Sequence, residues 1–293
     1  MVFVTGGTGL IGSHLLFELA SGNNKVRALK RNTSDIQKVI RTFSRYSDNP
    51  EVLFNQIEWV DGDILDYFSM EKLLSGVTEV YNCAAIVTFN RKERKKIIKN
   101  NVEGTANIVN ACIENGIKKI CHLSSVSALG KAQEGLLINE QTHWIPSKKN
   151  SGYSESKFFS ETEIWRGIEE GLDAVIINPS IVIGPGNWDS GSSQLFTTVW
   201  NGIKFYTKGI TGYVDVKDVV KAAILLMEDS NFSKYKNQRY LLNAQNLSYH
   251  DLFNQIADAL GRRRPQFFAP PFVLKAACLT SALVRILYRK FPS

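Results

Sequence analysis

The sequence has few cysteines, and they are not arranged as metal ligands or as a disulfide framework. Four cysteines occur among 293 residues, with no CxxC pair and no neighbouring histidine at metal-ligand spacing. We therefore expect no metal site, and we interpret the cysteines as small buried residues of a protein in a reducing compartment. They are Cys83, Cys112, Cys121 and Cys278.

Long apolar runs are also absent. The longest apolar stretch near the end runs from Ala276 to Val284, far short of the roughly 20 residues that span a bilayer. We predict a helix packed on the protein, with contact between this helix and a membrane surface as the alternative. The chain also opens without a basic leader or a cleavage site, which disfavours secretion and predicts a cytoplasmic protein.

Acidic residues are fewer than basic ones, 28 against 35, which gives a formal net charge of +7. Much of the excess lies in residues 91–96 and 262–264. No recognisable nucleic-acid-binding module accompanies either run, so no nucleic-acid partner is expected. The first run precedes Ile97, Ile98 and Val102 at helical spacing, which predicts a helix with a solvated basic face. Contact with an anionic substrate or lipid is the alternative.

Glycines are concentrated where a first strand meets a first helix. An apolar run at residues 2–5 leads directly into residues 6–12, which have glycine at positions 6, 9 and 12. Only glycine lets the turn close, the pyrophosphate approach the backbone and the helix pack on its strand, while the helix N-terminus attracts phosphate. A P-loop is excluded because no Gly-Lys-Ser/Thr follows. We predict a dinucleotide-binding turn formed by Gly6, Thr8, Gly9, Leu10, Ile11 and Gly12.

Strand and helix patterns alternate along the first part of the chain, which is typical of an α/β protein with a doubly wound parallel sheet. With the glycine turn, this predicts a Rossmann domain at residues 1–180, rejoined by about 212–220. Residues 181–293 are assigned to a smaller, mainly helical substrate lobe, which includes a strand at Gln238–Leu242. Asp218 is predicted to cap the helix that follows it. The predicted strands of the sheet are Val2–Thr5, Val26–Leu29, Ile57–Val60, Glu79–Asn82, Lys119–Leu123 and Ala174–Asn178.

The second predicted strand ends without the acidic residue that usually holds the ribose of NAD. That residue is expected about 20 positions after the glycines, whereas no carboxylate precedes Asp35 in the segment after the strand. Arg31, with Lys30, Thr33 or Ser34, could instead pair with a 2′-phosphate. We therefore favour NADP(H) as cofactor over NAD. The alternative is that Lys30 and Arg31 are ordinary solvated loop residues.

A tyrosine and a lysine four residues apart indicate a catalytic helix. Tyr153 and Lys157 are followed by Phe158, Phe159 and Ile164 at helical spacing, so both project from one face. Lowering the pKa of a tyrosine from about 10 by three units needs roughly 4 kcal/mol. A lysine ammonium about 4 Å away supplies on the order of 4 kcal/mol at an effective dielectric constant of 20. Lys157 is therefore sufficient to activate Tyr153 as an acid and base.

Serines follow the fifth predicted strand, at residues 124, 125 and 127. Ligands of parallel sheets bind at the carboxyl ends of the strands. A serine in this place can hold a substrate oxygen by a hydrogen bond while Tyr153 transfers the proton and the cofactor transfers the hydride. The sequence thus predicts a Ser–Tyr–Lys site.

Taken in order, these motifs resemble the extended short-chain dehydrogenase/reductase family within the NAD-dependent epimerase/dehydratase superfamily. They are most similar to its dihydroflavonol-reductase-like and 3β-hydroxysteroid-dehydrogenase-like members. The matching segments cover most of the chain up to about residue 260. They are residues 5–12, 61–64, 82–85, 101–105, 124–125, 153–157 and 178–185.

The resemblance implies further roles for individual residues. It implies that Ser125 is the catalytic serine, because Ser125 stands five residues before Gly130 as the family's serine stands before its glycine. It implies that Lys157 also holds the nicotinamide ribose. Family members often pair through a four-helix interface, so a homodimer is expected. Further cofactor contacts are implied for Asp63 at the adenine and the adjacent Ile64, for Ala84 and Ala85, and for Pro179 and Val182 beside the nicotinamide.

The sequence therefore predicts an NADP(H)-dependent oxidoreductase that interconverts a carbonyl and an alcohol on a mainly apolar small molecule. Ser125 is followed by Val126 and Ser127 rather than by an acidic pair, which disfavours the dehydratases of the family. Residues 128–130 are Ala-Leu-Gly where many epimerases have Val-Tyr-Gly, which weakens the interpretation as a sugar-nucleotide epimerase. Two alternatives stay open: a sugar-nucleotide epimerase with tightly bound NAD, and a non-catalytic nucleotide-binding protein.

Overall fold

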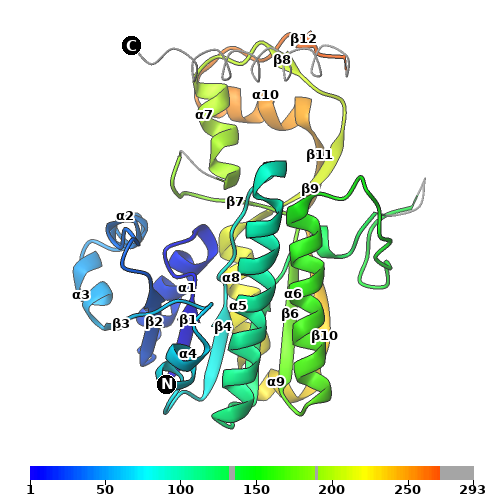
Figure 1. Cartoon of the computed structure of the whole chain (residues 1–293). Helices are drawn as coiled ribbons and strands as arrows, with labels where there is room; N and C mark the ends of the chain where they lie inside the picture. Colours follow the sequence, from blue (N-terminus) through cyan, green and yellow to red (C-terminus); the bar gives the residue numbers. More distant parts are fainter. Residues whose placement is uncertain (132–135, 189–190, 271–293) are drawn as a thin grey trace, which may run out of the picture. The chain divides into compact units, whose positions relative to one another are not determined.

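The computed structural model describes residues 1–131, 136–188 and 191–270, and Figure 1 shows their helices and strands. The chain falls into two compact units. The first comprises Met1–Asn187 and Tyr213–Ala244, and the second comprises Trp188–Gly212 and the chain from Gln245 onward. The predicted helix at 276–284 and Cys278 lie outside the described residues.

The first unit is built on a seven-stranded sheet in which neighbouring strands are parallel. The spatial order β10-β6-β5-β4-β1-β2-β3 means that the chain starts in the middle, builds out to β3 and then crosses back to β4. This order confirms the predicted doubly wound α/β fold and puts the switch point between β1 and β4, where such sheets bind ligands. The strands are β1 (Val2–Thr5), β2 (Val26–Lys30), β3 (Ile57–Asp61), β4 (Glu79–Asn82), β5 (Lys119–Leu123), β6 (Asp173–Pro179) and β10 (Gln238–Leu242).

Helices cover both faces of this sheet, and successive side chains of a strand enter opposite cores. Val2 and Val4 of β1 pack in the core with α1 and α8, whereas Phe3 packs in the core with α4, α5 and α6. The two long helices α5 and α6 run side by side in Figure 1. The helices of this unit are α1 (Leu10–Ser21), α2 (Gln37–Phe43), α3 (Pro50–Asn55), α4 (Tyr67–Leu73), α5 (Arg94–Glu114), α6 (Gly152–Glu169), α8 (Val216–Met227) and α9 (Asp229–Tyr235), with short 3-10 turns η1 (Arg91–Glu93) and η2 (Val126–Ala128).

A short parallel pair of strands leads into α8. Strand β7 (Ile181–Ile183) pairs with β9 (Ile210–Asp215), with Ile183 opposite Asp215. The Asp215 carboxylate accepts a hydrogen bond from the Lys217 backbone N–H at 2.7 Å and caps the helix. The prediction that Asp218 is the cap was wrong, because α8 begins directly after β9 and Asp218 already lies in its first turn.

The sequence assigns Gln238–Leu242 to the second lobe, whereas in the structure this segment is β10, the edge strand beside β6. Asn237, the residue before β10, has a left-handed backbone conformation with φ of 59°. Its side-chain oxygen accepts a hydrogen bond from the Ala174 N–H at 3.0 Å. The amino-acid pattern predicts a strand, but it does not name the strand that will pair with it.

The described part of the second unit contains two helices, α7 (Gln194–Trp200) and α10 (Tyr249–Ala259). Its short strands β8 (Phe205–Tyr206) and β12 (Phe267–Phe268) pair in parallel. The Arg262 guanidinium lies 3.7 Å from the centroid of the Trp200 ring. The remaining elements are a 3-10 turn η3 (Gly191–Ser193) and strand β11 (Gln245–Ser248).

Three cysteines lie in the described part of the chain, and all are free thiols: Cys112 and Cys121 are buried and Cys83 is half-buried. The described part of the chain contains no group of three or more His, Cys, Asp or Glu side chains that could hold a metal ion. None of the helices described is long and apolar enough to cross a membrane.

Candidate active site

The glycine turn after β1 is packed too closely for side chains. Gly6 has a φ of 68°, and a Cβ added to it would lie 2.6 Å from the carbonyl oxygen of Cys83. A Cβ on Gly12 would collide with the Gly6 carbonyl oxygen. The turn is closed by a hydrogen bond of 2.9 Å from the Gly9 N–H to that same oxygen. Glycine is therefore required here by the close approach of β1, β4 and α1 at the switch point.

The N-terminus of α1 has no side-chain cap. Its N-cap residue is Gly9, which leaves the first N–H groups of the helix without a side-chain acceptor. Helices α4, α6, α8 and α10 are each capped by the side chain of their N-cap residue. A bare helix N-terminus beside a glycine turn suits a pyrophosphate, so these residues fit the dinucleotide predicted from the sequence. Thr8, Leu10 and Ile11 are half-buried around the same turn.

Two cations at the end of β2 have different surroundings. The Lys30 ammonium is paired with the Asp61 carboxylate at the end of β3. Arg31 is exposed, and no ion pair is found for its guanidinium among the described residues. Its backbone N–H donates to the Ser34 hydroxyl oxygen at 3.1 Å, which fixes the turn. Of the predicted 2′-phosphate ligands, Arg31 and Ser34 are thus brought together, and Lys30 is engaged elsewhere.

The next predicted contacts of the cofactor have mixed placements. Asp63 is exposed and accepts a hydrogen bond from the Leu65 N–H at 3.0 Å. The Ile64 side chain is buried in the core, where it lies against Gly104 of α5. Any contact of Ile64 with a cofactor must therefore come from its backbone.

A buried chain of hydrogen bonds ties together the carboxyl ends of β1, β4 and β5. The Thr5 hydroxyl donates to the Asn82 side-chain oxygen at 2.8 Å, and the Asn82 amide nitrogen lies 3.1 Å from Nδ1 of His122. The Ala84 N–H donates to the Thr5 hydroxyl at 3.2 Å, which places Ala84 and the half-buried Ala85 beside the glycine turn. Burial, with the nearby Lys157 charge, holds the pKa of His122 well below its ordinary value.

The predicted Pro179 and Val182 lie where β6 passes into β7. Pro179 is buried at the end of β6 and Val182 is half-buried in β7. After β7, a Cβ on Gly184 would lie 3.9 Å from the Leu10 side chain at the start of α1. These segments therefore return to the edge of the sheet that carries the glycine turn.

Ser125, Tyr153 and Lys157 are brought together at the same edge. Ser125 is the N-cap of η2, and its side chain accepts a hydrogen bond from the Ser127 N–H at 3.1 Å. Tyr153 and Lys157 project from the first two turns of α6. Burial raises the pKa of Tyr153, and a hydrogen bond with Ser125 opposes this shift. The Ser154 hydroxyl donates to the Ser127 carbonyl oxygen at 2.7 Å, so the first turn of α6 lies against the Ser125 turn.

Lys157 is a buried cation with one direct hydrogen bond. It is 4% exposed, and its ammonium donates to the Leu123 carbonyl oxygen at 2.7 Å. Burial lowers the pKa of Lys157 to about 8, while electrostatic interactions with Cys83 and Glu161 act to raise it. The activation of Tyr153 by Lys157 that the sequence argument predicts stays a prediction, since the shifts that act on Tyr153 here come from burial and Ser125.

The loop after β4 exposes apolar side chains beside Tyr153. Phe89 is 73% exposed, and its ring centroid lies 5.5 Å from that of Tyr153 in an edge-on contact. Val87 is 56% exposed. Asn101 of α5 holds the loop in place, since its side chain accepts from the Ile86 N–H at 2.8 Å and donates to the Ile86 carbonyl at 3.0 Å. Sequence reasoning missed Phe89, whose only signal was an aromatic residue in the loop after the fourth strand.

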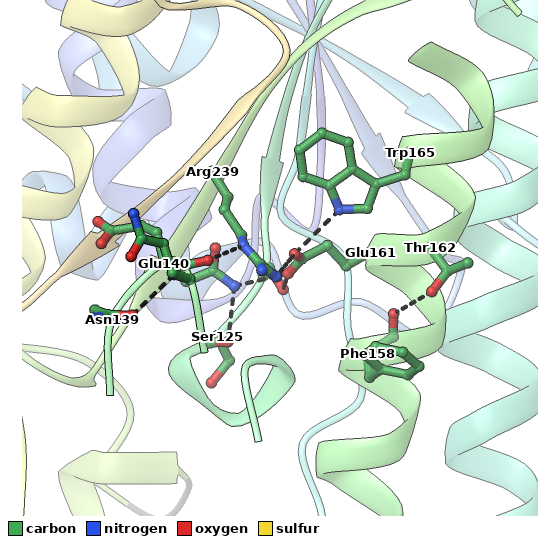
Figure 2. A network of polar contacts seen from close by, with 11 residues as sticks. Ser125, Asn139, Glu140, Phe158, Glu161, Thr162, Trp165 and Arg239 are labelled. Carbon is green, nitrogen blue, oxygen red and sulfur yellow. Dashed lines mark hydrogen bonds and ion pairs between the residues drawn. The ribbon is translucent and has the colours of Figure 1, made fainter. Parts of the chain in front are cut away.

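Sequence reasoning also missed the buried carboxylate of Glu161, which Figure 2 shows between Arg239 and Trp165. Glu161 lies on α6, one turn after Lys157, and is 3% exposed. Its signal in the sequence was the i, i+4, i+8 spacing with Tyr153 and Lys157, which puts all three on one helix face.

Comparison with known proteins identifies the family of the chain. The family model described as "NAD dependent epimerase/dehydratase family" matches residues 2–240. A dihydroflavonol 4-reductase from Callistephus chinensis is 27% identical over 283 residues, 92% of this chain and 74% of its own. Sterol demethylase protein B from Methylococcus capsulatus is 27% identical over 282 residues, 94% of this chain and 79% of its own. The solved UDP-glucose 4-epimerase of Thermotoga maritima shares the fold, with a TM-score of 0.76 and 21% identity over 92% of this chain and 85% of that one.

Proposed function

The chain belongs to the NAD-dependent epimerase/dehydratase family and is an NAD(P)-dependent enzyme of the extended short-chain dehydrogenase/reductase type, and from this premise we propose that it is an NADP(H)-dependent oxidoreductase. It interconverts a carbonyl and an alcohol on a mainly apolar small molecule. The observation that carries the proposal is the packing of the helix with Tyr153 and buried Lys157 against the Ser125 turn, where the Lys157 ammonium donates to the Leu123 carbonyl oxygen at 2.7 Å. This group lies at the sheet edge that also holds the bare N-terminus of α1.

The three side chains have distinct roles in the proposed reaction. Ser125 and Tyr153 donate hydrogen bonds to the substrate oxygen, and Tyr153 gives up its proton in reduction and takes one back in oxidation. Burial alone would keep Tyr153 protonated, so the Lys157 ammonium is needed to stabilise the tyrosinate. When bound, the nicotinamide supplies or accepts the hydride. In this proposal Lys157 also holds the nicotinamide ribose.

Arg31 supports NADP(H) as the cofactor. Lys30 is neutralised by Asp61, so Arg31 is the cation at the end of β2 that is available for a 2′-phosphate. A guanidinium binds phosphate by two parallel hydrogen bonds, which a ribose hydroxyl cannot reproduce. Ser34, which lies against the Arg31 backbone, adds a hydroxyl donor.

Phe89 and Val87 support an apolar substrate. Both are exposed on the loop whose Phe89 ring touches Tyr153, so an apolar group bound there would remove both from water. One relative is named dihydroflavonol 4-reductase, and this name states the reduction of a dihydroflavonol. A substrate with an apolar body next to its carbonyl fits this surface.

The second candidate is a sugar-nucleotide epimerase that keeps NAD bound through the cycle. The observation in its favour is Asp61, a carboxylate at the end of β3 that reaches Lys30 at the end of β2. An acidic group near this position suits the ribose hydroxyls of NAD. Tightly held NAD in the purified protein is the result expected from this candidate.

The test is a calorimetric titration of the protein with NADPH, NADH, NADP and NAD, beside Arg31→Ala and the control Arg41→Ala. Arg41 lies nearby, carries the same charge and is paired with Asp35. We expect a preference for the phosphorylated cofactors that falls about 10- to 100-fold in Arg31→Ala, as loss of a charge-assisted hydrogen-bonded pair implies. Arg41→Ala should keep the preference. Equal or tighter binding of NAD by the unmodified protein overturns the assignment and favours the epimerase.

A further inference from the structure

Four hydrogen-bond donors converge on the buried carboxylate of Glu161. One oxygen accepts from the Ser124 hydroxyl and from the Asn178 amide, both at 2.8 Å. The other accepts from the Arg239 guanidinium at 3.2 Å and faces the Trp165 indole N–H at 3.4 Å. A carboxylate that only accepts, from both oxygens, is the form that suits these partners. Glu161 is therefore a fixed negative charge inside the site rather than a surface group.

Two of these donors connect Glu161 to the serine pair. The Ser124 hydroxyl binds the carboxylate directly. Asn178, at the end of β6, donates one hydrogen to Glu161 and the other to the backbone carbonyl oxygen of Ser125, at 3.0 Å. Figure 2 shows the chain of contacts from Ser125 to Glu161 and on to Arg239. The backbone that carries the Ser125 hydroxyl is thus tied to α6, the helix that carries Tyr153 and Lys157.

We propose that Glu161 is a positioning residue for this active site. It locks the Ser124–Ser125 turn in register with α6 and presents a negative charge to Lys157 from one helical turn below. The proposal rests on the Ser–Tyr–Lys function proposed above. Glu161 does not touch substrate or cofactor in this role and acts through Ser125 and Lys157.

The charges around Lys157 come from three elements. Cys83 follows β4, His122 lies on β5 and Glu161 lies on α6. Cys83 and His122 belong to the sheet strands and the loop that follows them. Burial raises the pKa of Cys83 to about 12, which keeps the thiol protonated at ordinary pH. Burial lowers the pKa of His122, which keeps its imidazole neutral. Glu161 is the carboxylate of this set and lies one helical turn after Lys157 on α6.

Arg239, on the edge strand β10, is the cationic partner of Glu161. Its guanidinium binds Glu161 and also donates to the Glu140 carbonyl oxygen at 2.8 Å. The Glu140 carboxylate in turn accepts from the Leu241 N–H at 2.9 Å. Arg239 therefore links the loop around Glu140 to the Glu161 carboxylate, which also binds Ser124. This connects the loop to helix α6.

The experiment measures the titration of Lys157 without any substrate. Trace labelling of the full chain with acetic anhydride, quantified for the Lys157 peptide by mass spectrometry across a pH series, gives the midpoint at which the amine becomes reactive. In Glu161→Gln we expect this midpoint to fall by roughly one pH unit, because the charge that favours the ammonium is gone. At a fixed pH below the midpoint, Lys157 should be labelled about ten-fold more.

The matched control is Glu163→Gln, which removes a carboxylate from the same helix, where it pairs with Arg166 at the surface; its Lys157 midpoint should not move. Glu161→Asp keeps the charge and should restore most of the midpoint. Arg239→Gln removes the opposing cation and should raise the midpoint. Should Glu161→Gln fail to fold, the upward shift in Arg239→Gln still tests the proposal. An unchanged midpoint in either folded variant overturns it.

Protection by NADP separates this proposal from the proposed function. Bound NADP should shield Lys157 from the label if the cofactor site is assigned correctly. Absent protection, with cofactor present at saturating concentration, rejects the proposed cofactor site, whereas the midpoints of the variants report on Glu161 alone. Once a substrate is known, Glu161→Gln should lower kcat and leave KM within about two-fold, because a displaced serine and lysine act on the transition state.

Discussion

Helices α1 and α6 begin at the same edge of the same sheet and are built in opposite ways. Helix α1 starts from a bare glycine, with no side chain on its first N–H groups. Helix α6 starts from Ser151, whose hydroxyl accepts a hydrogen bond from the Ser154 N–H at 3.0 Å. The first helix offers its backbone, while the second satisfies its backbone and offers the side chains Tyr153 and Lys157.

This difference teaches how one fold separates binding from chemistry. A helix end that is to hold an anion must keep its N–H groups free and its neighbours small. A helix that is to carry an acid and a base must be anchored, because the side chains are useful only at fixed positions. Under the proposed function, the glycines at 6 and 12 serve the first need and the contacts of Glu161 serve the second.

The largest effect is expected from removing the chemical group on α6. Tyr153→Phe should lower kcat about 1,000-fold, because it deletes the proton donor of a general acid, and should leave NADPH binding unchanged. The measurement is turnover of any ketone or aldehyde that the wild-type protein reduces. Tyr240→Phe is the control, since Tyr240 lies on β10 and its hydroxyl donates to the carbonyl oxygen of Tyr235 at the end of α9. Unchanged turnover in Tyr153→Phe rejects the catalytic assignment.

NADPH binding at the N-terminus of α1 should be lost when a single methyl group is added to the glycine turn. In Gly12→Ala the new Cβ meets the Gly6 carbonyl oxygen, so we expect NADPH to bind at least about 100-fold more weakly, the scale of a lost pyrophosphate site. Gly116→Ala is the control: Gly116 has a φ of 67° with open space around it. That variant should lose about 1 kcal/mol of stability through backbone strain and bind NADPH normally.

Lys157 should show the cost of a buried functional charge. Its pKa falls to about 8 from 10.5 through burial, so between these values the unfolded chain holds a proton that the folded protein has released. Stability therefore rises as the pH increases through this window and is lowest below it. Lys157→Met should raise the free energy of unfolding at neutral pH by about 3 kcal/mol while it abolishes turnover. Urea unfolding at neutral and alkaline pH measures this, and a variant that keeps the wild-type pH dependence contradicts the assignment.

The smallest effect is expected from the cap of α6. Ser151→Ala removes the acceptor for the Ser154 N–H and should lower the free energy of unfolding by about 1 kcal/mol. Thermal unfolding measures the change. Ser147→Ala, in the preceding loop, removes a local acceptor for the Lys149 N–H outside any helix and should have no effect. An equal loss in both variants would mean that the serine at 151 acts as a loop residue rather than as a cap.

The strands of the sheet were predictable because they are short β-branched runs between turn residues. β1, β4, β5 and β10 match the predicted limits, and β2, β3 and β6 each extend one residue further at one or both ends. The cap at Asp215 was not predicted, because two aspartates stand three residues apart and only the end of β9 decides between them.

Glu161 shows what the sequence could not reveal. Its partners Ser124, Asn178 and Arg239 lie 37, 17 and 78 positions away along the chain, so only the folded sheet brings them to one carboxylate. Helical spacing identified the face of α6 but gave no reason to expect a charge to be buried on it. The NADP preference, the individual roles of the site residues, the homodimer and the cytoplasmic location stay predictions.

The position of β10 affects how the protein is made on the ribosome. Synthesis runs from the amino end, so β6 emerges well before β10, its partner on the open side. Until β10 arrives, β6 has an unpaired backbone edge of the kind that other chains can join, and Glu161 lacks the Arg239 guanidinium. The nascent chain thus carries an exposed strand edge and a Glu161 carboxylate without its guanidinium partner at the same time. One late strand pairs with the first and supplies the second.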